Sequence, residues 1–211
     1  MNRINYQKEL DKVIDGLTNR PRLLLHSCCA PCSSYCLVYL LLHFDITCFY
    51  YNPNITDPDE YEKRGSELER LVDMLNEEYR DKLSEFSPIS VIRGEHEPDV
   101  FVEAVKRQNL EECPEGGMRC EMCFATRLTK THALAKANGF DYFTTTLTIS
   151  PLKDADLINT IGSRIATTGS VMWLPSDFKK KDGYKQSVEL SAKYDLYRQN
   201  YCGCEYSKNT I

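Results

Sequence analysis

The residues best suited to chemistry in this 211-residue chain are its ten cysteines, most of which lie in three short clusters. Residues 26–32 read HSCCAPC, residues 120–123 read CEMC and residues 202–204 read CGC. Thiolates bind metal ions and attack disulfides, so clustered cysteines in a reducing compartment indicate a metal site or redox catalysis.

The first cluster directly follows an apolar run and opens a predicted helix. Backbone N–H groups and the positive end of a helix favour the thiolate form at such a position. Two interpretations remain open. Cys29 and Cys32 form a CxxC pair after a strand, as in thioredoxin-like proteins. Alternatively, Cys28 and Cys29 are paired metal ligands that are completed by cysteines elsewhere in the chain.

The second cluster places Cys120 and Cys123 at the start of another predicted helix, where both sulfurs can face one metal from a single turn. Together with Cys28 and Cys29 they supply four thiolates, which suit either a tetrahedral zinc ion or a [4Fe–4S] cluster. We expect the flexible pair 116–117 (Gly-Gly) to let this loop approach the first cluster.

The third cluster, Cys202-Gly203-Cys204, spaces two thiols so closely that a disulfide between them would be strained and readily reduced. A redox-active pair is therefore one interpretation, and two unrelated thiols near the end of the chain are the other. The remaining cysteines show no ligand spacing, and we expect them to pack as small apolar side chains: Cys36, Cys48 and Cys113.

Short apolar runs alternate with longer helical patterns along the chain, which predicts an α/β fold with a parallel, Rossmann-like sheet of about five strands and helices on both faces. The predicted strands are 22–26, 46–51, 89–92, 142–147 and 171–174. The predicted helices lie near 33–43, 57–81, 98–109, 121–138, 154–166 and 184–199. Residues 1–21 read as an amphipathic helical extension to a single domain at 22–211. In such sheets the site lies beyond the carboxyl ends of the strands.

Composition narrows the class of protein further. The hydrophobic fraction of 42% is enough for a core without disulfides, and the net charge of −5 gives no overall signal for nucleic acid. The polar residues 1–22 lack the apolar stretch of a signal peptide, and no run is long enough to span a bilayer. These features predict a cytoplasmic protein with no membrane contact.

Two further segments carry chemically useful groups. Residues 144–154 (TTTLTISPLKD) run from a strand into a loop, so Ser150, Lys153 and Asp154 are candidate substrate contacts. Ordinary turn chemistry with Asp154 as a helix N-cap is the alternative. The basic run 176–185 contains Lys179, Lys180, Lys181 and Tyr184, and Arg198 follows it. Basic and aromatic side chains together suit single-stranded RNA, although such a run also suits a solvated face.

Six motifs in fixed order resemble the cobalamin-independent epoxyqueuosine reductases of the QueH family, over about residues 23–207. They are HSCCAPC, FYYNPNI, PEGGMRCEMCFATRL, YFTTTLTISPLKD, SDFKKKDGYKQSVELS and LYRQNYCGC. The resemblance implies reduction of the epoxide of epoxyqueuosine, at the wobble position of tRNA, to the alkene of queuosine. It also implies a sheet similar to that of adenine-nucleotide α-hydrolases.

The resemblance further implies roles for individual residues. Four cysteines would ligate a [4Fe–4S] cluster: Cys28, Cys29, Cys120 and Cys123. Cys202 and Cys204 would form a redox-active disulfide, and Cys32 would ligate an additional adjacent iron. Asp154 and a metal-bound water are both candidate proton donors, and an electron donor that the sequence does not identify is required. The basic run, with Tyr184 and Arg198, would hold the anticodon arm. A zinc-stabilised RNA-binding module and a thioredoxin-like dithiol reductase are the alternatives.

Overall fold

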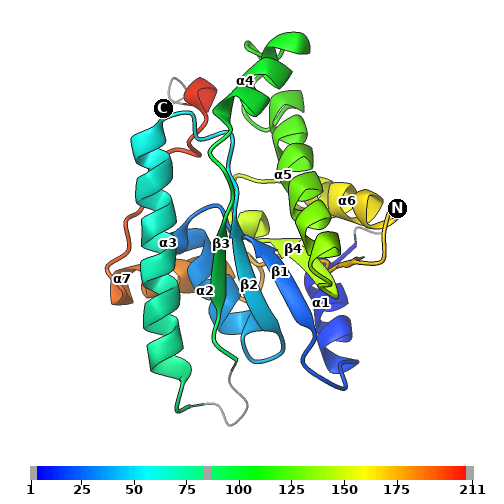
Figure 1. Ribbon diagram of the computed structural model, residues 1–211, viewed down its shortest axis with the longest axis vertical. Coiled ribbons are helices and arrows are strands. Elements are labelled where there is room, and N and C mark those ends of the chain that lie inside the picture. The colour runs from blue at the N-terminus through cyan, green and yellow to red at the C-terminus, as the bar shows by residue number, and fades with distance from the viewer. Residues whose placement is uncertain (1–3, 83–86, 208–211) are drawn as a thin grey trace.

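The computed structural model describes residues 4–82 and 87–207, and these residues form a five-stranded parallel sheet with helices packed around it (Figure 1). Across the sheet the order is β3-β2-β1-β4-β5. The strands are β1 (Arg22–His26), β2 (Asp45–Tyr50), β3 (Ser90–Arg93), β4 (Tyr142–Thr145) and β5 (Met172–Trp173). The predicted α/β class and the five strands are therefore confirmed.

The helices cover both faces of this sheet (Figure 1). One face is covered by α1 (Tyr6–Asp15), α2 (Ala30–Leu40), α3 (Pro58–Tyr79) and α7 (Gly183–Lys193). The other is covered by α5 (Met118–Ala137) and α6 (Ala155–Ala166), and α4 (Pro98–Arg107) packs on α5. Among the described residues, no helix is long and apolar enough to cross a membrane.

The central strand β1 is buried on both faces because its side chains alternate between two cores. Leu23 and Leu25 pack with α2 and α3, whereas Leu24 points to the opposite face against α5 and α6. Each of these fully buried leucines contributes roughly 2 kcal/mol of burial free energy. This double burial explains why the strand is a continuous apolar run in the sequence.

The N-terminal helix α1 packs against the α2 face through the stripe that its periodicity predicts. Leu10 is fully buried, and Val13, Ile14 and Leu17 pack beside it. Ile4 has the spacing to join this stripe, but it lies before the helix and is 58% exposed. Asn5 caps the helix by accepting a hydrogen bond from the Lys8 N–H.

The predicted end of the fourth strand differs from the structure, whereas the predicted end of the helix before it does not. The predicted strand 142–147 stops at Thr145, because the Thr145 hydroxyl accepts from the Leu147 N–H and turns the chain into a 3₁₀ helix, η1 (Thr146–Ile149). The end of α5 is as predicted: Asn138 is its C-cap and Gly139 follows with a φ of +66°.

The largest correction concerns the last predicted helix, 184–199, since α7 ends at Lys193. The chain turns at Asp195, whose φ is +49°. Arg70 of α3 donates to the carbonyl oxygens of Tyr194 and Asp195, which stabilises this turn. Residues 194–207, the C-terminal strap, then run along α3 to the short 3₁₀ helix η2 (Glu205–Ser207). The CGC cluster therefore lies on the strap and not directly after a helix.

Candidate active site

The three cysteine clusters meet at the carboxyl ends of β1 and β4. Strand β1 pairs with β2 along one edge and with β4 along its other edge. The strand order therefore reverses between β1 and β4, which makes this pair the topological switch point. The backbone N–H of Cys28, after β1, donates to the Thr146 hydroxyl, after β4, over 3.3 Å. Parallel α/β proteins bind ligands at this position, as the sequence predicts here.

A cavity of about 130 Å³, the thiol cavity, opens at this point and is lined by side chains from every cysteine cluster. Six of the cysteines line it: Cys28, Cys32, Cys120, Cys123, Cys202 and Cys204. The residues come from the β1–α2 turn, the start of α5, the β4–α6 loop and the C-terminal strap. The fold therefore assembles one site from cysteines that are far apart in the sequence.

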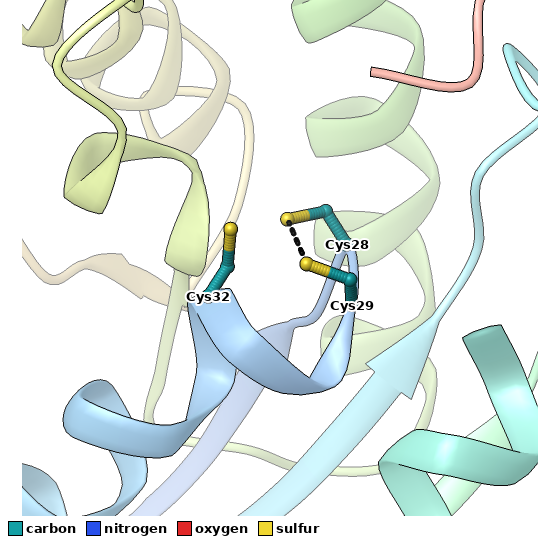
Figure 2. Close-up of side chains that lie close together, drawn as sticks. All are labelled: Cys28, Cys29 and Cys32. Carbon is teal, nitrogen blue, oxygen red and sulfur yellow. Dashed lines mark hydrogen bonds between the residues drawn. The ribbon is translucent and has the colours of Figure 1, made fainter. Parts of the chain in front are cut away.

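Three of these sulfurs form a compact group, the sulfur triad of Cys28, Cys29 and Cys32. Their Sγ atoms all lie within 4.8 Å of one another, a spacing that allows them to share a metal ion. Figure 2 shows the triad at the turn from β1 into α2, with 3.8 Å between the sulfurs of Cys28 and Cys29. Helix α2 begins at Ala30, carries Pro31 in its first turn and has no side-chain cap, so its positive end lies beside these sulfurs.

The triad favours one thiolate, which lies on Cys28. Hydrogen bonds from Cys29 and then Cys32 hold the pKa of Cys28 well below its ordinary value, although burial opposes the shift. Cys29 and Cys32 keep their protons because they donate these hydrogen bonds to Cys28. The pKa of Cys29 is therefore raised to about 12, and that of Cys32 is raised as well. A metal ion bound to these sulfurs would displace the remaining thiol protons, because cysteine ligates metals as the thiolate.

The second cluster enters the cavity from the first turn of α5. Cys120 is half-buried and Cys123 is buried, and both line the cavity that Cys28 and Cys32 also line. The N–H of Gly116 donates to the Cys120 sulfur over 3.3 Å, and Gly116 has a φ of +83°. The glycine pair therefore shapes the loop that delivers these sulfurs, as the sequence predicts.

The third cluster brings two thiols of opposite character to the same cavity. A hydrogen bond from Cys204 lowers the pKa of Cys202 to about 5, against the effect of burial. The Cys204 thiol has a raised pKa because it donates to Cys202 and is buried. The residue between them, Gly203, has a φ of +96°, which brings both cysteines into the cavity wall.

Lys153 and Asp154 lie at the mouth of the cavity, on the loop before α6. Burial alone lowers the pKa of Lys153, but the nearby sulfurs, those of Cys28, Cys32 and Cys202, outweigh this effect and raise it. Asp154 is the N-cap of α6 and accepts from two backbone N–H groups through Oδ1. The N-cap reading of Asp154 is therefore confirmed, and its carboxylate also lines the cavity.

The structure divides the candidate substrate residues between two hollows beside the cavity. Tyr184 and Arg198 line the rim groove, a hollow of about 430 Å³ that shares Cys32, Lys153 and Cys202 with the thiol cavity. Lys179 and Lys180 line another hollow, of about 600 Å³, on the far side of Lys153 and Asp154. Lys181 lines neither and forms an ion pair with Asp11 of α1.

The structure adds cavity residues that sequence spacing does not reveal. Arg64 of α3 is 2% exposed, pairs with Glu60 and donates to the Tyr201 carbonyl on the strap. Arg127 is buried one helical turn after Cys123, and this i, i+4 spacing is the only local signal that could have identified it. The amides of Asn54 and Gln199 also line the cavity.

The other cysteines pack among apolar side chains, as the sequence predicts. Cys36 and Cys48 are fully buried, and burial raises the pKa of both thiols, that of Cys48 to about 12. Cys113 is half-buried and packs against the apolar cluster that contains Phe101 and Val105. None of the three lines the thiol cavity.

Fold and site together define an α/β protein whose reactive groups are thiols gathered at the switch point of a parallel sheet. Residues 23–210 match the family model described as epoxyqueuosine reductase QueH. Curated proteins with that name are similar over most of their length. Those of Staphylococcus epidermidis and Streptococcus pyogenes are each 41% identical over 97% of this chain, covering 85% and 78% of the respective relative. That of Thermotoga maritima is 35% identical over 88% of this chain and 89% of its own length.

The chain therefore belongs to the QueH family of epoxyqueuosine reductases, which are oxidoreductases. The family resemblance of the six motifs is confirmed. The thiols of the sulfur triad give this oxidoreductase a group that can hold a metal.

Proposed function

We propose that this chain reduces the epoxide of epoxyqueuosine in tRNA to the alkene of queuosine, with release of water. The relatives that carry the name epoxyqueuosine reductase support the reaction. The observation that carries the proposal is the meeting of three cysteine clusters in one cavity, because the reaction needs two electrons, two protons and a group that polarises a C–O bond.

The donor set of the cavity fits an iron–sulfur cluster. Cys28 lines the cavity with the Cys29 sulfur beside it, Cys120 and Cys123 line it from α5, and thiolate sulfur is the ligand that such clusters require. We assign the [4Fe–4S] cluster to these four residues and the additional iron to Cys32, which lies within reach of the same ion as Cys28. When bound, these groups would supply one-electron transfer and Lewis acidity toward the epoxide oxygen.

The strap cysteines are proposed to supply the electron pair. Cys202 and Cys204 lose two electrons as an S–S bond forms between them, and the epoxide gains two as both of its C–O bonds break. Cys202 is a thiolate at neutral pH, so the pair releases one proton, from Cys204. The second proton of the water formed must come from another acid. We assign its delivery to Asp154, which joins the cavity to solvent.

The tRNA is proposed to lie over the rim groove. Tyr184 is 42% exposed there and can stack on a base, while Arg198 and Lys180 are exposed and can contact phosphates. An external electron donor must then reopen the disulfide after each turnover, since the dithiol holds only one electron pair.

Anaerobic purification tests the metal assignment. We expect a brown protein with iron, acid-labile sulfide and broad absorbance at about 400 nm. Cys120→Ala should abolish this absorbance, whereas Cys113→Ala, which changes a thiol outside the cavity, should retain it. A colourless protein that carries only zinc would contradict the cluster and favour a zinc-stabilised RNA-binding module.

Turnover tests the reaction itself. The reconstituted protein is incubated with tRNA containing epoxyqueuosine and a reductant, and nucleosides are identified by mass spectrometry. We expect queuosine from the unaltered chain and none from Cys202→Ser, although that variant should remain brown. Activity that survives complete removal of metal would instead support a thioredoxin-like dithiol reductase.

A further inference from the structure

The thiol cavity contains buried polar atoms whose hydrogen-bonding capacity is unused. Among the described residues, four buried side-chain nitrogen or oxygen atoms have no partner, and three of the side chains line this one cavity: Asn54, Arg119 and Gln199. The fourth is His132 on α5. Buried polar atoms in folded proteins nearly always have a partner, so these three point to one that the cavity's ligand supplies.

The orientation of Asn54 is determined by its neighbour on the strap. Its Nδ2 donates to the carbonyl oxygen of Cys202 over 3.1 Å. A carbonyl can only accept, so the amide nitrogen must face it and Oδ1 must point elsewhere. Asn54 is 2% exposed, and its Oδ1 therefore remains a buried acceptor beside the reactive strap.

Gln199 presents a second acceptor, because a Cys29 thiolate that ligates a metal can only accept and therefore faces the amide nitrogen. Its Nε2 donates to the sulfur of Cys29 over 2.8 Å, which leaves Oε1 buried and without a partner. Two amide oxygens thus lie in one cavity, one held by the CGC strap and one by the sulfur triad. The third atom, Arg119 Nε, is a donor that any anion or sulfide could satisfy, so it does not help to identify the ligand.

The chemistry of the two acceptors specifies their partner. An iron–sulfur cluster offers sulfides and thiolates, which accept hydrogen bonds, so it cannot satisfy an amide oxygen in this way. O–H groups can. We propose that Asn54 Oδ1 and Gln199 Oε1 accept hydrogen bonds from ring hydroxyl groups of the substrate and select a hydroxylated epoxide over one without hydroxyls. This inference rests on the proposed function, since the epoxyqueuosine ring carries two hydroxyls beside its epoxide.

Equilibrium binding tests this selection without turnover. The full chain, reconstituted anaerobically and carrying Cys204→Ser, is titrated with anticodon stem-loops that contain epoxyqueuosine or an analogue lacking both ring hydroxyls. An analogue that leaves buried acceptors unpaired should bind about tenfold or more weakly. Asn54→Ser and Gln199→Met should each reduce this preference by about fivefold or more.

Asn52→Ser provides the matched control. Asn52 is equally buried and lies two residues away, but its amide bonds Ser27 and Arg127 and it does not line the cavity. Its substitution should leave the preference unchanged, and a ratio of two affinities is insensitive to a partly folded preparation. Iron content, measured in the same samples, should not fall in Asn54→Ser or Gln199→Met.

Three results would overturn the inference. The first is equal binding of both stem-loops by the chain in which Asn54 and Gln199 are unchanged, and the second is an unchanged preference in both cavity variants. The third is loss of iron in those variants, which would make the amides metal ligands. The proposed function fails separately. A protein that prefers the hydroxylated stem-loop but never forms queuosine would refute only the reaction, and one that reduces both stem-loops equally would refute only the selection.

Discussion

Cys202 and Cys204 are separated by one glycine, yet the structure gives their thiols opposite properties. The Cys204 S–H donates to Cys202, and this hydrogen bond lowers the pKa of Cys202 to about 5 while raising that of Cys204. An attacking thiolate and a proton-bearing thiol thus stand side by side. This is the arrangement from which a dithiol passes to a disulfide, because one sulfur is already the nucleophile.

Alkylation of the reduced, metal-free protein should distinguish the two thiols. A lowered pKa means that Cys202 is deprotonated above about pH 5, so its rate with iodoacetamide should rise through pH 5 and level off by about pH 7. Cys204 should react appreciably only in alkaline solution. Peptide mass spectrometry reads both rates, and a Cys202 midpoint at the ordinary thiol value of about 8.5 would contradict the assignment.

Lys153 should contribute to this reactivity through its positive charge. Its attraction is one of the causes that lower the pKa of Cys202, after the hydrogen bonds that Cys202 makes with Cys204 and Ser207. Lys153→Met should therefore move the alkylation midpoint of Cys202 to higher pH, whereas Lys153→Arg should restore it. Lys180→Met removes an exposed lysine from the adjacent hollow, and an equal shift in that variant would show that the effect is not local.

At the scale of elements, the C-terminal strap is the part of the site with the most demanding backbone. It is fastened along α3 by Arg64 and Arg70, and Glu67 accepts from the Tyr197 N–H. Gly203 then adopts a φ of +96°, and a Cβ there would lie 2.6 Å from Ile55 Cγ1. Only glycine satisfies both requirements, so the CGC spacing reflects packing as well as chemistry.

Gly203→Ala should consequently destabilise the fold more than a substitution that carries only the backbone strain. We expect a loss of about 2–3 kcal/mol in the free energy of unfolding, from left-handed backbone and the clash with Ile55. Gly116→Ala is the control, because Gly116 also has a positive φ but has open space around its Cβ position; its loss should be about 1 kcal/mol. Urea unfolding measures both, and equal losses would show that the packing against Ile55 is unimportant.

The elements also show which features sequence patterns can predict. The β1–α2 and β4–α6 connections were predictable, since apolar runs end there and helix signals begin. The strap was not, because residues 184–199 continue a helical pattern that contacts from Arg70 interrupt at Asp195. The orientation of the Asn54 amide could not be predicted from the sequence either. It depends on a hydrogen bond to the carbonyl of Cys202, which is 148 residues away in the sequence.

At the scale of the whole molecule, the net charge of −5 must be overcome locally if tRNA is to bind. Several basic side chains are already engaged within the protein, including Lys179 with Asp177 and Lys181 with Asp11. Exposed basic groups beside the cavity, such as Lys180 and Arg198, are therefore the best placed to contact phosphates.

Binding of tRNA should accordingly weaken as salt increases, and Arg198→Ala should lower the magnitude of the slope of log K against log salt by about one. Lys136→Ala is the control, since this exposed lysine lies in the last turn of α5, about 26 Å along the helix from Arg119, the first α5 residue at the cavity. Filter binding at several salt concentrations measures the slopes, and equal slopes for the two variants would place the RNA elsewhere on the surface.

The strap also determines the order in which the site is completed during synthesis. The triad cysteines lie early in the chain, whereas the strap follows all five strands. At roughly 5–20 residues per second, the ribosome releases Cys28 many seconds before Cys202. The thiols that could hold a metal are therefore made first, and the strap pair is made only when the sheet that supports it is already available for folding. If the proposed roles hold, a nascent chain has the means to capture metal before it has the means to exchange electrons with a substrate.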